Sequence, residues 1–89
     1  MIDLDELAQM LQDLGMDVEE LNPEYLGAAY TDVDGEEVFV TATEDRATVE
    51  VVRAGDSTVR TWGNLHARGV ARNVGRIISS IDRRHNYER

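Results

Sequence analysis

The sequence contains no cysteine, no lysine, one proline and one phenylalanine among its 89 residues. Without cysteine, the chain can form no disulfide and offers no thiolate as a nucleophile or metal ligand. Its uninterrupted apolar runs are short, as at 38–40, so we expect no membrane-spanning segment. The opening residues, Met1 to Asp3, lack the basic start and apolar stretch of a secretion signal. We therefore expect a cytoplasmic protein with no membrane partner.

The length and composition favour one small folded domain spanning residues 1–89. Leu, Ile, Val and Phe make up about a quarter of the chain, which is above the level typical of disordered, highly charged sequences. A chain of this size buries a modest core and leaves little room for a deep catalytic cleft. The sequence therefore favours a binding domain over an enzyme.

Charge is distributed very unevenly along the chain. Eighteen acidic residues oppose nine basic residues, giving a net charge of −9, and every basic residue is arginine. Residues 1–45 hold 14 of the acidic residues and no basic one, whereas residues 46–89 hold all nine arginines. This balance opposes general binding to nucleic acid and favours a basic partner. Adaptation to high salt or a GC-rich genome would produce a similar composition.

Hydrophobic spacing predicts a helix at 3–14, with Asp3 as its N-cap and Gly15 at its end. Residues 16–24 are interpreted as an acidic connector, broken at Asn22-Pro23. Strands are expected at 25–33 and 37–43 around the hairpin signal Asp34-Gly35.

Another strand is expected at 46–53, followed by a short fourth strand at 58–62. The last helix is predicted at 65–84, with Asn64 as its N-cap. Its Gly69 and Gly75 are expected to permit close contact with the sheet. The order α-β-β-β-(β)-α predicts a two-layer α+β domain, in which an antiparallel meander sheet packs against two helices.

Two features of the sequence resemble parts of metal or catalytic sites. Asp32-Val33-Asp34-Gly35 resembles part of a calcium loop, but the first ligand and the bidentate Glu of such a loop are missing. His66 and His85 are the only histidines and lie near no nucleophile or zinc motif. We expect no catalysis, no metal and no cofactor.

Arg68, Arg72 and Arg76 recur every four residues and form a basic stripe on the last helix. The element order α-β-β-β-α resembles that of the double-stranded RNA-binding domain, whose last helix crosses the duplex phosphates. That resemblance implies RNA binding through the stripe, but the paired lysines of the family have no counterpart at 62–68. Direct nucleic-acid binding is kept as an alternative.

The meander sorts the acidic residues into two groups. One group lies at the tip of the first hairpin: Asp32, Asp34, Glu36 and Glu37. The other is expected at the opposite end, with the connector approaching it: Glu19, Glu20, Glu24, Glu44 and Asp45. If the last helix runs back across the sheet, it brings Arg83 and Arg84 towards the tip and leaves the second group bare.

A bare group of carboxylates can occupy an Arg- and Lys-lined groove as phosphates do. Small phage anti-restriction and anti-CRISPR proteins are similar in size, acidity and lack of cysteine. This resemblance implies a nucleic-acid-mimicking inhibitor. We therefore predict a non-enzymatic module whose two acidic groups bind a basic, nucleic-acid-binding partner protein. A further alternative is a self-associating subunit, which exposure of Phe39, Val52 or Trp62 on the outer sheet face would support.

Overall fold

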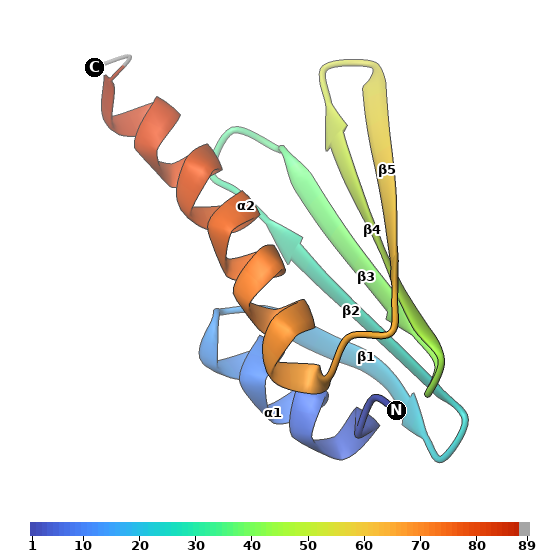
Figure 1. Cartoon of the computed structure of the whole chain (residues 1–89). Helices are drawn as coiled ribbons and strands as arrows, with labels where there is room; N and C mark the ends of the chain where they lie inside the picture. The colour runs from blue at the N-terminus through green and yellow to red at the C-terminus, as the bar shows by residue number, and fades with distance from the viewer. Residues whose placement is uncertain (88–89) are drawn as a thin grey trace.

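Two helices cover one face of a five-stranded antiparallel sheet in the computed structural model, which describes residues 1–87, and side chains for residues 1–82 (Figure 1). In chain order the elements are α1 (Leu4–Asp13), β1 (Asp17–Asn22), β2 (Tyr25–Thr31), β3 (Glu37–Ala42), β4 (Arg46–Arg53), β5 (Asp56–Gly63) and α2 (Ala67–Tyr87). Each strand pairs with its neighbours in sequence, in the order β1-β2-β3-β4-β5. The α+β class, the meander and the two-layer arrangement predicted from the sequence are confirmed.

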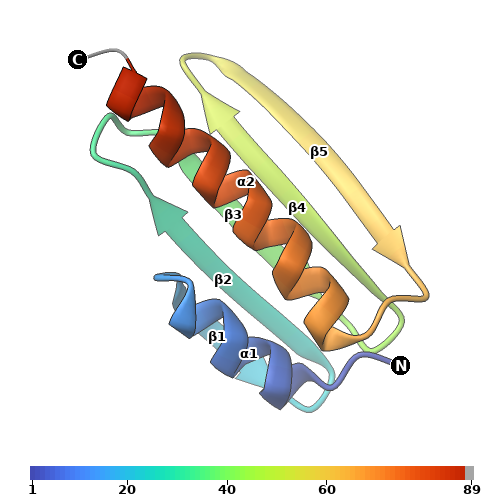
Figure 2. The ribbon, with the colours of Figure 1, turned by 60° about the vertical axis from the view of Figure 1, so that its left-hand side comes forward.

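The core lies between the helices and the inner face of the sheet. Figure 2 shows α2 running along the middle of the sheet and α1 over its β1 edge. The helices contribute Leu7, Leu11, Val70 and Val74 to the core, all fully buried. From the sheet, alternate residues of β2, β3 and β4 point into this layer, and they are Leu26, Ala28, Val38, Val40, Ala42, Ala47, Val49 and Val51.

The first helix begins as the sequence predicts. Oδ1 of Asp3 accepts a hydrogen bond of 3.1 Å from the backbone N–H of Glu6. This bond satisfies one of the backbone donors that a helix leaves free in its first turn. The backbone of Ile2 donates to the carbonyl of Glu44 at 2.8 Å, and this bond fixes the entry to the helix against the β3–β4 turn.

Residues 17–22 form β1, so the prediction of a connector at 16–24 was wrong. A β-bulge between Val18 and Glu20 interrupts the pairing with β2. The bulge shifts the alternation of side chains. Val18 and Leu21 are three positions apart, yet both pair with residues of β2 that face the helices. A search for period-two alternation therefore misses this strand.

The β2–β3 hairpin turns through residues 33–35, and β2 ends at Thr31, not at the predicted Val33. The N–H of Gly35 donates to the carbonyl of Asp32 at 3.0 Å, and the N–H of Asp32 donates to the carbonyl of Glu36 at 2.7 Å. Gly35 has a φ of +85°, as expected for the residue that closes such a loop in the left-handed region.

The fourth predicted strand is a full edge strand, β5, of eight residues. With β1 and β5 the sheet has five strands, so the element order differs from that of the double-stranded RNA-binding domain. Trp62 pairs with the buried Ala47 and packs against the core, so its expected place on the outer face was wrong. Phe39 and Val52 are half-buried.

The second helix begins at Ala67, two residues after the predicted start, and ends at Tyr87 instead of Arg84. Asn64 has a φ of +58° and is not the N-cap. Instead, the carbonyl of His66 accepts the first helical bond, from the N–H of Val70. A Cβ at Gly75 would lie 3.3 Å from Cδ2 of Leu14, so this glycine permits close contact with the end of α1, not with the sheet.

Neither of the described helices is long and apolar enough to cross a membrane.

Candidate functional site

Carboxylates from separate segments meet at the end of the sheet that carries the β1–β2 and β3–β4 turns. Glu24 lies in the first of these turns and Glu44 and Asp45 in the second, and all three are exposed. The opening segment joins them through the bond from Ile2 to Glu44. We call Asp5, Glu24, Glu44 and Asp45 the acidic end.

Two residues of the acidic end, Asp5 and Glu44, border a surface hollow of about 400 Å³. Residues 1–5, Asn22, Pro23 and Glu44 line this hollow. Within residues 1–82, none of the acidic-end side chains forms an ion pair. A cationic partner at this end would lower the repulsion among these carboxylates.

Glu19 and Glu20 lie on β1, close to the acidic end. Glu20 pairs with Gly27 on the outer face of the sheet, which the helices leave uncovered. A shallow hollow of about 290 Å³ lies there, and its lining includes both glutamates together with Tyr25, Gly27, Phe39 and Thr41. Carboxylates beside two aromatic rings can bind a guanidinium or ammonium group, which pairs with the carboxylates and contacts the rings.

The hairpin-tip carboxylates lie at the other end of the sheet and are held more closely by the fold. Asp32 is only 9% exposed. Oε2 of Glu36 lies 4.0 Å from Nε of Arg53, at the end of β4. Glu37 is half-buried at the start of β3, and Asp34 is exposed in the turn. The nine predicted partner-binding residues thus lie in two groups, and the tip group is at the opposite end of the sheet from Glu24, Glu44 and Asp45, as expected for a meander.

Tyr30 connects the tip end of β2 to α2. Its hydroxyl donates a hydrogen bond of 3.2 Å to Oδ1 of Asp82. Burial raises the pKa of Tyr30 above its ordinary value of 10, and so do the hydrogen bond to Asp82 and the negative charges of Asp82 and Asp32. The side chains of Arg83, Arg84 and His85 lie outside the described residues.

The predicted basic stripe is present on α2. Arg68, Arg72 and Arg76 are all exposed and form no ion pair within residues 1–82. His66 immediately precedes the helix and is exposed. No group of three or more Asp, Glu or His side chains that could hold a metal ion occurs among the described residues.

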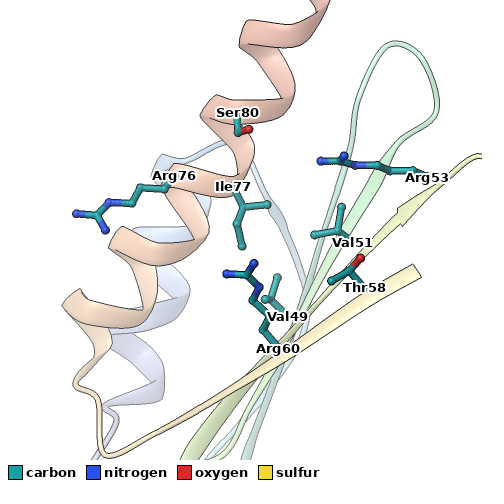
Figure 3. A pocket seen from close by; sticks show the side chains of 8 residues that line it. All are labelled: Val49, Val51, Arg53, Thr58, Arg60, Arg76, Ile77 and Ser80. Atoms are coloured by element: carbon teal, nitrogen blue, oxygen red, sulfur yellow. The ribbon is translucent and has the colours of Figure 1, made fainter. Parts of the chain in front are cut away.

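Sequence reasoning missed a groove between α2 and the β4–β5 hairpin (Figure 3). Its volume is about 360 Å³, and its lining consists of Val49, Val51, Arg53, Thr58, Arg60, Arg76, Ile77 and Ser80. The strand register brings these residues together, because Val51 pairs with Thr58 and Val49 with Arg60. The sequence signal for this groove was the alternation of Thr58, Arg60 and Trp62, which places their side chains on the same face of β5.

The chain matches no protein-family model, no curated protein and no solved structure.

Proposed function

We propose that this protein binds a basic surface of a partner protein through its acidic end. The observation that carries this proposal is the meeting of exposed carboxylates from three chain segments with no ion pair among the described side chains. The tip carboxylates are less accessible to a partner, because Asp32 is buried and Glu36 lies beside Arg53. These differences support the acidic end, rather than the hairpin tip, as the binding surface.

The chemistry of the neighbouring outer face supports a partner rich in arginine. Glu19 and Glu20 place charge beside the rings of Tyr25 and Phe39. A guanidinium can pair with a carboxylate and stack on an aromatic face at the same time. In this role the carboxylates take the place of nucleic-acid phosphates in the partner's groove, and the protein competes with nucleic acid for that groove.

The proposal is tested by nuclear magnetic resonance with an arginine-rich peptide as the probe. The expected result is chemical-shift change at Glu24, Glu44 and Asp45 and over the Glu19–Glu20 surface. The variant with Glu24→Lys, Glu44→Lys and Asp45→Lys should lose most of this binding. A control with Asp13→Lys, Asp17→Lys and Asp56→Lys makes the same change in net charge at exposed positions elsewhere.

The matched control distinguishes binding at the acidic end from general attraction between the negative protein and the positive peptide. If both triple variants weaken peptide binding equally, net charge alone explains the affinity and the proposal fails. Mimicry of nucleic acid is tested by competition. The protein should release a labelled DNA duplex from its complex with the same peptide. An acidic-end variant that releases the duplex as well as the original protein would contradict this role.

Nucleic-acid binding through α2 is a second candidate, supported by the exposure of Arg68, Arg72 and Arg76. It predicts affinity for duplex RNA or DNA that falls steeply with salt. Replacing the three arginines by alanine should remove that affinity, whereas the acidic-end variant should strengthen it. Absence of duplex binding at low salt would eliminate this candidate.

A further inference from the structure

We propose that the groove between α2 and the β4–β5 hairpin binds a small phosphate monoester that carries an apolar group. This site is separate from the acidic end, because Arg53 and Ser80 lie towards the opposite end of β4 and in the later half of α2. The inference does not depend on the proposed function.

The charge of the lining identifies the ligand as an anion. Three arginines line the groove, and no acidic residue does, in a chain whose net charge is −9. Arg53 forms an ion pair with Glu36, which lies outside the lining, and 4.0 Å separates Nε of Arg53 from Oε2 of Glu36. Arg60 and Arg76 form no ion pair within residues 1–82. An anion between the guanidinium groups of Arg53 and Arg60 would lower the repulsion between them.

The directions of the side chains define where the anion would lie. Figure 3 shows Arg53 and Arg60 reaching from the sheet towards α2, while Arg76 points away on the other side of the helix. The hydroxyls of Thr58 and Ser80 belong to the same lining. We place the anionic group between Arg53 and Arg60, and Arg76 does not contact it.

The number of donors favours a phosphate monoester over a carboxylate. Two guanidinium forks and two hydroxyls provide more hydrogen-bond donors than the two oxygens of a carboxylate can use. A phosphate monoester has three acceptor oxygens and nearly two negative charges at neutral pH. Both properties match a site with this many donors and this much positive charge.

The floor of the groove favours an apolar group on the ligand. Val49 and Val51 are buried in the sheet layer, and Ile77 is half-buried on α2. The groove volume of about 360 Å³ falls within the usual range for sites of small molecules. A phenyl-sized group can rest on these side chains while its phosphate meets the arginines.

Phenyl phosphate is the probe, and inorganic phosphate and benzyl alcohol supply its two halves separately. In magnetic-resonance titrations we expect phenyl phosphate to shift the signals of Val49, Val51 and Ile77 and to saturate. It should bind at least about tenfold more tightly than inorganic phosphate, because the ring is removed from water. Arg60→Gln should weaken its binding by about tenfold or more. Arg72→Gln is the matched control, since Arg72 is exposed on α2 and outside the groove.

Three outcomes would overturn the proposal. The first is an equal loss of affinity in Arg60→Gln and Arg72→Gln, which would indicate general attraction to the arginines of the chain. The second is equal binding of phenyl phosphate and inorganic phosphate, which would remove the role of the apolar floor. The third is no saturation up to about 10 mM phenyl phosphate, a concentration at which even weak specific ligands bind. None of these outcomes affects the acidic end.

Discussion

The hydroxyl of Tyr30 donates a hydrogen bond of 3.2 Å to Oδ1 of Asp82. These residues lie 52 positions apart in the chain, and their contact fastens the tip end of β2 to the later half of α2. Burial and this bond both favour the neutral hydroxyl, so the pKa of Tyr30 is raised. The contact therefore has a measurable consequence at alkaline pH.

Tyr30→Phe should lower the free energy of unfolding by about 0.5–1 kcal/mol near neutral pH, because one net hydrogen bond is lost. A tyrosine whose pKa is raised by folding contributes stability that is fully present below pH 10. That contribution is lost as the pH rises through the folded-state pKa. Urea titrations from pH 7 to 11 should therefore show a steeper alkaline loss of stability in the original protein than in Tyr30→Phe. Identical pH profiles would contradict this linkage.

Two glycines in α2 should respond differently to alanine. At Gly69 the added Cβ would meet only Leu65, at 3.6 Å, so the gain in helix propensity should appear as about 0.5–1 kcal/mol of added stability. At Gly75 the Cβ would lie 3.3 Å from Leu14, which must move to accept it. The midpoint of thermal unfolding should therefore be higher for Gly69→Ala than for Gly75→Ala. The reverse order would show that the contact between the helices does not limit substitution.

Repulsion at the acidic end should make stability depend on salt. Reversing Glu24, Glu44 and Asp45 to Lys changes the net charge by two units at each position, from −9 to −3. In dilute buffer this variant should be more stable than the original protein, and the difference should shrink at 1 M salt, where the screening length is about 3 Å.

The same measurement on the variant with Asp13→Lys, Asp17→Lys and Asp56→Lys separates local from overall repulsion. If crowding at the acidic end matters, this control should gain less stability in dilute buffer. Equal gains would show that only net charge acts, and a more stable original protein would contradict the repulsion itself.

Much of the fold could be predicted because its local signals agree with its packing. Asp3 caps α1 as its position suggests, and the spacing of Leu7, Leu11, Val70 and Val74 marks the faces that the helices bury. β1 could not be found by alternation, since the bulge near Glu20 breaks the period of its side chains. The length of β5 was underestimated because nearly all of its side chains are exposed, as in an edge strand, and show no apolar alternation.

The candidate sites were predictable to different degrees. The two turns that carry Glu24 and Glu44 lie at one end in any meander of this order, so their proximity follows from topology alone. The groove requires tertiary information, because Arg53 and Arg60 come together only through the β4–β5 register and the position of α2. The proposed roles of both sites stay predictions.

The contact between Gly75 and Leu14 has a consequence for how the chain folds. Every strand pair joins neighbours in sequence, whereas the helical layer closes only when segments near residues 14 and 75 meet. During synthesis the strands can pair as they emerge, but their apolar face stays open until α2 is complete. We therefore expect the late step of folding to be the docking of α2, and ribosome-bound chains that end before it to expose this face to chaperones.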